Sequence, residues 1–140
     1  MVNMVFYDTA QISRLERAIE ESDWFTAIVL AATQLERHGS MVIKDYLQSL
    51  KVDSILTDKM LEPLYLIDIA QCLLTMKKID KKEFNTLMKI NTARKHFVHR
   101  REKEKIKHAL QAEKEYGALA SEAIRILKEK LNAVRLFVSR

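Results

Sequence analysis

Glycine and proline are scarce in this chain of 140 residues, which holds two glycines and one proline. These residue types supply the tight turns between strands and the phosphate-cradling loops of nucleotide-binding folds. Three of them cannot supply the turns of a sheet, so the composition argues against a sheet-rich fold and favours an all-α one. With 48% hydrophobic residues the chain can bury one core, and we predict a single helical domain over residues 1–140.

The chain has a single cysteine and no long hydrophobic run. The lone Cys72 excludes an internal disulfide, and its apolar surroundings indicate a core residue. The longest apolar run, Ala27–Ala32, has six residues, whereas a membrane-spanning helix needs roughly 20. The N-terminal sequence MVNMVFYDTAQ lacks the basic and apolar regions of a secretory signal. We therefore expect a cytoplasmic protein without a membrane partner.

Positive charge is concentrated in one short segment. The chain has 24 lysines and arginines and 19 acidic residues, a net charge of +5. The segment from Arg94 to His108 alone holds seven basic and two acidic residues, and so carries the whole excess, with three of the four histidines. Such a focused basic patch suits a polyanion such as the phosphate backbone of a nucleic acid. The alternative is a solvated, lysine-rich helix start.

Apolar residues recur at helical spacing, which predicts a bundle of four to five up-and-down helices with a long C-terminal helix. The predicted helices cover about residues 8–21, 22–50, 58–76, 80–99 and 102–138. The second continues across Gly39, residues 51–57 form a connection, and Pro63 is tolerated in the first turn of the third. Asp80 and Glu83 form a capping box at the start of the fourth. The third is apolar nearly all round, so it is either central or shared with a second subunit.

Arg94 interrupts the apolar face of the predicted helix over residues 80–99. With about 100° of rotation per residue, it falls inside a stripe of otherwise apolar positions. The stripe consists of Phe84, Leu87, Ile90, Phe97 and Val98, with Asn91 beside Arg94. A guanidinium there is costly unless it is paired. Two interpretations stay open, an ion pair with Glu36 or Asp68 on a neighbouring helix, or an anion site at a cleft or dimer seam.

His99 lies five residues after Arg94, which in a continuous helix places it about 140° around the axis and about 7.5 Å along it. The two residues therefore do not converge on one helix face. They approach only if the helix unwinds near Phe97–His99, or if two subunits bring their copies together. A lone histidine at a helix C-terminus also serves as a cap that compensates the helix dipole.

The sequence INTARKHFVHRREK resembles the HEPN domains of prokaryotic toxins and antiviral RNases, whose signature is an arginine followed after four to six residues by a histidine. Here the match is Arg94-Lys95-His96-Phe97-Val98-His99, with Lys95 where family members often have asparagine. The stretch LAATQLERHGSMVIKDYL is similar to the family's long second helix. The likeness in architecture extends over about Thr9–Val138 and implies an all-helical bundle of four to five helices.

By this resemblance, active members are metal-independent endoribonucleases whose composite site forms when two subunits appose their motifs, while some members are non-catalytic. Cleavage without a metal can use the adjacent 2′-OH as nucleophile, and it needs a proton acceptor, a proton donor and a cation facing the phosphate. Histidine suits either proton role near neutrality, and arginine offers phosphate a fixed fork of donors. The catalytic candidates are Arg94 for the phosphate, His99 for proton transfer and His96 as an accessory. The candidates for binding the RNA backbone are Lys95, Arg100, Arg101, Lys103, Lys105 and Lys107.

Three hypotheses stay open. The leading one is a homodimeric HEPN-type RNase, a toxin or defence effector with an antitoxin or other partner protein. The second is a catalytically silent helical module that binds RNA or a partner through the same basic surface, and the third is a structural dimer in which Arg94 is an ion-pair residue. No cofactor and no metal is expected, because basic residues surround His96, His99 and His108 and no cysteine or close carboxylate completes a ligand shell.

Overall fold

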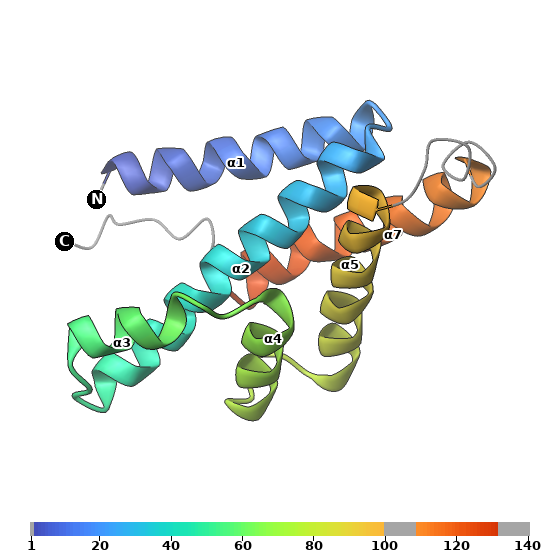
Figure 1. Cartoon of the computed structure of the whole chain (residues 1–140). Coiled ribbons are helices and arrows are strands. Elements are labelled where there is room, and N and C mark those ends of the chain that lie inside the picture. Colours follow the sequence, from blue (N-terminus) through green and yellow to red (C-terminus); the bar gives the residue numbers. More distant parts are fainter. Residues whose placement is uncertain (1, 100–108, 132–140) are drawn as a thin grey trace.

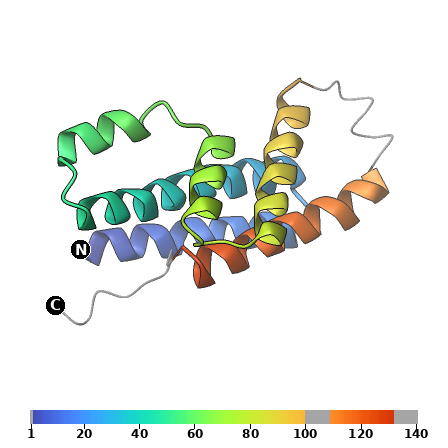
Figure 2. The same cartoon turned by 90° about the horizontal axis from the view of Figure 1, so that it is seen from below.

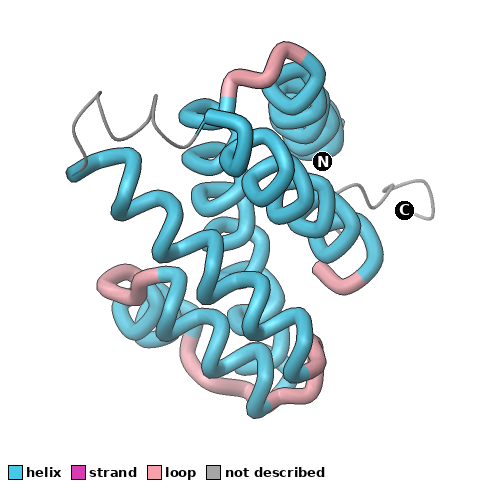
Figure 3. Tube along the Cα trace, turned by 90° about the vertical axis from the view of Figure 1, so that its right-hand side faces the viewer, coloured by secondary structure: helices cyan, strands magenta, loops and turns pink. Residues whose placement is uncertain are grey.

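The computed structural model describes residues 2–99 and 109–131, and the side chains of residues 10–97 and 114–131. In this part of the chain six helices and their connections account for the fold, without strands (Figures 1 and 3). The helices are α1 (Val2–Glu20), α2 (Trp24–Ser49), α3 (Ser54–Leu61), α4 (Leu66–Thr75), α5 (Lys81–His99) and α7 (Ala109–Glu129). The predicted all-α class is confirmed.

Helix α2 is the axis of the molecule, because it packs against each of the other five described helices. It starts at Asp23, whose side chain accepts a hydrogen bond from the backbone N–H of Thr26, and it continues across Gly39 as predicted. Figure 2 shows α1 on one side of α2, with α3 and the C-terminal end of α5 on the other. Residues near the middle of α2 are therefore flanked by other helices on both sides.

The predicted third helix over residues 58–76 is wrong, because the chain forms two helices there. Helix α3 begins at Ser54, inside the predicted connection, where the Asp53 side chain accepts a hydrogen bond from the N–H of Leu56 at 3.0 Å. It ends at Leu61, before Pro63, since proline cannot continue the hydrogen-bond ladder of a helix interior. Proline therefore lies in the connection between α3 and α4 rather than in a first turn.

Helix α5 starts at the predicted capping box. The backbone N–H of Asp80 donates to Glu83 at 2.8 Å, and the N–H of Glu83 donates to Asp80 at 2.8 Å. The other carboxylate oxygen of Glu83 accepts a hydrogen bond from Arg125 of α7 at 2.8 Å, with only 2% of the Glu83 side chain exposed. One buried carboxylate thus both starts α5 and ties it to α7.

The two outer helices differ from their predicted bounds. Helix α1 begins at Val2, before the predicted start near residue 8, because no proline or glycine interrupts the preceding residues. Helix α7 ends at Glu129, where the N–H groups of Lys130 and Leu131 both donate to the carbonyl of Ile126 and close the last turn. Residues 102–108 and 132–138 of the predicted last helix lie outside the described residues.

The core is aliphatic and draws on α1, α2, α4, α5 and α7. Its largest fully buried apolar side chains are Leu15, Ile28, Leu35, Leu66, Ile69, Leu73, Leu87, Ile90, Ile126 and Leu127. Helix α4, which forms most of the predicted apolar third helix, packs against both α2 and α5. Cys72 is partly buried against this core, as predicted. Within the described ranges no helix has the length and apolar character needed to cross a membrane.

Candidate functional site

Arg94 is fixed by a two-point ion pair with Glu36 across the contact between α5 and α2. Its Nη1 donates to Oε1 of Glu36 at 2.9 Å, and its Nη2 donates to Oε2 at 3.1 Å and to Oδ1 of Asn91 at 3.2 Å. This parallel arrangement matches the planar fork of a guanidinium to a carboxylate. The predicted pairing with Glu36 is confirmed, whereas Asp68 instead accepts a hydrogen bond from the N–H of Tyr65 at 3.0 Å.

Glu36 joins a third helix to this pair. Its Oε2 also accepts a hydrogen bond from the backbone N–H of Leu66 at 2.9 Å, which is the first residue of α4. The carboxylate therefore satisfies one of the N–H groups left free at a helix start, and its negative charge is favourable at that end of the helix dipole. Residues from α2, α4 and α5 meet at Glu36, so the position of Arg94 depends on all three helices.

The side chain of Arg94 is partly exposed to solvent. It is 22% exposed and that of Glu36 is 25% exposed, so the pair lies at the edge of the core. The three hydrogen bonds to Glu36 and Asn91 use three of the five guanidinium N–H groups. The next two residues, Lys95 and His96, are both exposed. A cation held in place beside two exposed basic side chains is an arrangement that can receive an anion.

Helix α5 is continuous to His99, so of the two ways in which Arg94 and His99 could approach, unwinding near Phe97–His99 does not occur. Phe97 helps to hold this end in place, because its ring lies 5.9 Å from that of Phe25 of α2 and 5.0 Å from that of Tyr116 of α7. Positions 94 and 99 are thus separated by about 140° around one helix. The side chain of His99 lies outside the described residues. Within one chain the two positions do not share a helix face. Of the two ways in which Arg94 and His99 could approach, the one that remains is pairing between two subunits.

The basic segment over residues 100–108 lies outside the described residues. Arg100, Arg101, Lys103, Lys105 and Lys107, like His108, lie outside the described residues, so their role in binding RNA stays a prediction. Among the described residues no three His, Cys, Asp or Glu side chains are grouped so as to hold a metal ion. His96 alone of the predicted histidines has a described side chain, and it is exposed.

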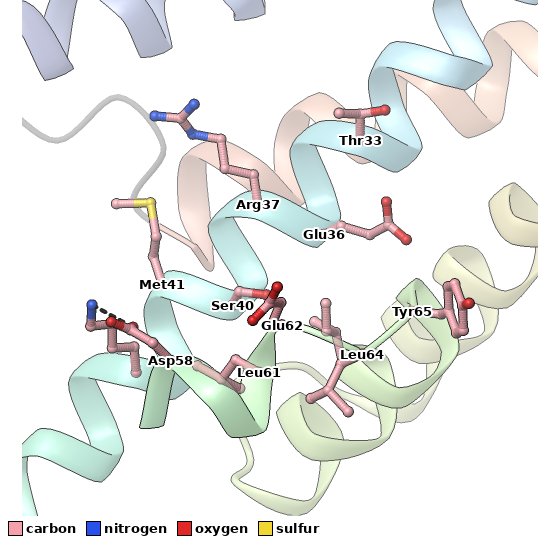
Figure 4. Close-up of a pocket in the computed structure, with 12 residues that line it drawn as sticks. Thr33, Glu36, Arg37, Ser40, Met41, Asp58, Leu61, Glu62, Leu64 and Tyr65 are labelled. Atoms are coloured by element: carbon pink, nitrogen blue, oxygen red, sulfur yellow. Dashed lines mark ion pairs between the residues drawn. The ribbon is translucent and has the colours of Figure 1, made fainter. Parts of the chain in front are cut away.

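A cleft of about 580 Å³ leads away from the Arg94–Glu36 pair between α2 on one side and α3 and α4 on the other (Figure 4). It is lined by Thr33, Glu36, Arg37, Ser40, Met41, Lys44, Asp58, Leu61, Glu62, Leu64, Tyr65 and Ile69. Glu36 and Tyr65 lie at one end in Figure 4 and Asp58 at the other, where it pairs with Lys44 at 2.8 Å. The sequence pattern does not reveal this cleft, because it predicts a connection over residues 51–57 and one helix over residues 58–76.

In comparisons with known proteins, no family model, no curated protein and no solved structure matched the chain.

Proposed function

We propose that this protein is a metal-independent endoribonuclease of the HEPN type, with a composite site built by two copies of the chain. The observation that supports this most is the Arg94–Glu36 pair, because it fixes a partly exposed guanidinium near the C-terminal end of α5, beside exposed Lys95 and His96. A cation that is already held in place stabilises a transition state better than a mobile one, since it needs no rearrangement as negative charge develops on the phosphate.

In the proposed reaction the 2′-oxygen of a ribose attacks the adjacent phosphorus and loses its proton to a base. The bond from phosphorus to the 5′-oxygen of the next nucleotide breaks, and that oxygen takes up a proton from an acid. The products are a 2′,3′-cyclic phosphate end and a free 5′-hydroxyl end. His99 serves one of the two proton roles, and an N–H group of Arg94 that Glu36 and Asn91 do not occupy binds a phosphate oxygen as negative charge builds up.

Glu36 is a positioning residue in this scheme. It holds Arg94 against the start of α4, so the guanidinium faces the phosphate from a fixed place. It also neutralises part of the positive charge, which weakens the attraction for the phosphate. The proposal therefore requires that RNA reaches a single unoccupied N–H group of Arg94 without displacing Glu36.

The test is cleavage of mixed single-stranded RNA by the purified chain in EDTA, with analysis of the product ends. We expect 2′,3′-cyclic phosphate ends from the unaltered chain, and a loss of about 100-fold or more in rate for His99→Ala and for Arg94→Ala. Arg17→Ala, which removes an exposed arginine of α1, is the matched control and is expected to cleave normally. Cleavage that survives both site variants would overturn the proposed site.

The Arg94–Glu36 pair also supports the second candidate, a catalytically silent module that binds RNA or a partner protein, because Glu36 already neutralises Arg94 without any substrate. Under that hypothesis RNA binds without turnover. For single-stranded RNA the slope of log K against log salt is about 0.7 per phosphate contact, so replacing Arg100, Arg101 and Lys103 by alanine should reduce it by about 2. Replacing the exposed Lys77, Lys78 and Lys82 is the matched control. An equal effect of both triple changes would argue against a phosphate-binding segment.

A further inference from the structure

We propose that the ring of Phe25 is a stacking platform for an unpaired base of single-stranded RNA. This inference rests on the proposed function, since it takes RNA as the ligand, and it names the form of RNA that the site binds. Phe25 is 48% exposed at the start of α2, whereas its neighbour Trp24 is partly buried beside Gly117 of α7. Of the seven large hydrophobic residues that are exposed in the described chain, five lie within residues 46–60, so Phe25 is separate from most of them.

The ring of Phe25 is held in place from α5 and α7. Its centroid lies 5.9 Å from that of Phe97, with the two planes at 86°, and the Phe97 ring in turn lies 5.0 Å from that of Tyr116. In such an edge-to-face contact the two rings meet on one side only, so Phe97 covers at most one face of the Phe25 ring. A base that stacks on a ring that is already oriented does not have to order it, which favours binding.

Phe25 lies next to the part of α5 that holds the phosphate-binding candidate. Helix α5 ends beside the start of α2 (Figure 1), where Phe97 contacts Phe25. Arg94 and Phe97 are three residues apart, so they are neighbours on one face of α5. A phosphate at Arg94 and a base on Phe25 are therefore separated by a single side chain, that of Phe97. A strand of RNA can reach both.

The charges around Phe25 indicate how the strand lies. On the α5 side Lys95 and His96 are exposed, and the basic segment follows α5 in the sequence. On the other side, the turn between α1 and α2 carries exposed Glu21 and Asp23, which repel a phosphate backbone. We therefore expect the phosphates along the end of α5, while a base, which carries no charge, extends over Phe25.

A stacking platform predicts a preference for unpaired RNA. Bases in a duplex are already stacked on their neighbours, whereas those of single strands and loops can be splayed out and stacked on an aromatic side chain. Such stacking tolerates any sequence, because every base has a flat π-face. The inference thus gives selection for strandedness, which a cation facing a phosphate does not provide by itself.

The test measures the binding of a labelled single-stranded RNA of about ten nucleotides by fluorescence anisotropy, in chains that also carry His99→Ala so that the RNA stays whole. We expect Phe25→Leu, which keeps an apolar contact with Phe97 but loses the flat ring, to lower the affinity about tenfold, and Phe25→Tyr to retain it. The slope of log K against log salt should not change in Phe25→Leu, because no phosphate contact is lost.

Two controls accompany this comparison. Tyr46→Leu removes a ring that is 45% exposed and lies about 30 Å further along α2, so it should leave the affinity unchanged. A blunt duplex of the same RNA should bind equally with and without Phe25→Leu. A single strand of equal length with abasic sites should bind the chain with intact Phe25 about tenfold more weakly, which tests the platform without altering the protein.

A loss confined to the single strand, at an unchanged salt slope and with recovery in Phe25→Tyr, supports the proposal. Equal binding by Phe25→Leu and Tyr46→Leu, or equal binding of the intact and the abasic strand, overturns it. Cleavage by chains that keep His99 separates the two proposals. His99-dependent cleavage with binding insensitive to Phe25→Leu keeps the RNase and removes the platform, whereas binding that depends on Phe25 without any cleavage keeps the platform and removes the RNase.

Discussion

At the scale of single residues, Arg94 has a structural role that any catalytic role must share. It closes the contact between α2 and α5, and Glu36 links it to the start of α4. We expect Arg94→Ala to lower the free energy of unfolding by about 1–3 kcal/mol, because the partly buried Glu36 loses its charged partner. Urea unfolding followed by circular dichroism measures this. A stability equal to that of the unaltered chain would mean that the pair contributes nothing to the fold.

The same arginine allows structure and activity to be separated. Arg94→Lys keeps the positive charge beside Glu36 but loses the planar fork. It should therefore recover part of the lost stability while RNA cleavage stays low, since a single ammonium cannot hold the carboxylate and a phosphate in the same geometry. If activity and stability were to fall and recover together across Arg94→Ala and Arg94→Lys, the purely structural hypothesis for Arg94 would be favoured.

Glu83 is the second residue whose environment predicts a large effect. It accepts hydrogen bonds from the N–H of Asp80 and from Arg125, and Lys130 lies 3.6 Å away. Hydrogen bonds to Glu122 and then to Glu83 raise the pKa of Arg125 above its ordinary value, so its titration adds no pH dependence near neutrality. We expect Glu83→Ala to cost about 2–4 kcal/mol in thermal unfolding, because the capping box and the buried end of the pair are both lost.

Glu122 provides the control for Glu83. It also pairs with Arg125, but its side chain is 34% exposed, against 2% for Glu83. Partly solvated pairs contribute little, so Glu122→Ala should cost less than about 1 kcal/mol. Equal costs for the two variants would contradict the importance assigned here to burial and to the start of α5.

At the scale of helices, the two glycines predict opposite responses to alanine. A Cβ on Gly39 would lie 2.5 Å from Cγ2 of Ile69 and 3.2 Å from Cδ1 of Leu73, because α2 and α4 are in close contact there. A Cβ on Gly117 would lie 3.3 Å from the edge of the Trp24 ring. Alanine is favoured over glycine inside a helix by about 1 kcal/mol. We expect Gly39→Ala to lose about 1–3 kcal/mol despite that gain, and Gly117→Ala to stay within about 1 kcal/mol of the unaltered chain.

Thermal melting of the two glycine variants checks this difference. If Gly39→Ala were as stable as Gly117→Ala, α2 and α4 would have to separate at little cost. The comparison matters for the site, because α4 reaches Glu36 through the N–H of Leu66 and depends on its distance from α2. A loosened α4 should therefore also weaken the hold of Glu36 on Arg94.

Helical periodicity predicted most elements but could not predict where α3 and α4 divide. The apolar pattern runs through residues 58–76 without a gap, although Pro63 already lies beyond the first turn of a helix that starts at residue 58. Both a tertiary and a local contact fix the start of α4, since the N–H of Leu66 donates to Glu36 of α2 and the N–H of Tyr65 donates to Asp68, three residues later. Asp53 and Asp80 likewise cap helices through neighbours in the sequence. Local caps can be identified from the sequence, whereas a helix start satisfied from another helix cannot.

At the scale of the whole molecule, the sequence located the unusual residue but not its surroundings. The apolar stripe of α5 identified Arg94 and offered Glu36 or Asp68 as partner, and only the packing of α2 against α5 decides between them. The cleft beside Glu36 is lined in part by α3, which the periodicity did not separate from α4. Surfaces shared by several helices depend on their arrangement in space, and a pattern read along one chain carries little information about it.

The last prediction concerns two copies of the chain. Because positions 94 and 99 lie about 140° apart on one continuous helix, a working site should take Arg94 from one copy and His99 from the other. Arg94→Ala and His99→Ala chains are each expected to be inactive alone. In an equal mixture after subunit exchange, half of the dimers are mixed and each holds one intact site of two, so about a quarter of the activity should return.

RNA cleavage in EDTA by the mixture measures this, with mass labels on one variant to confirm that exchange has occurred. Mixing Arg94→Ala with a chain that carries both Arg94→Ala and His99→Ala supplies the control, since no mixed dimer then holds an intact site. A mixture of the two single variants that exchanges subunits and stays inactive would mean that Arg94 and His99 act within one chain or do not act in cleavage.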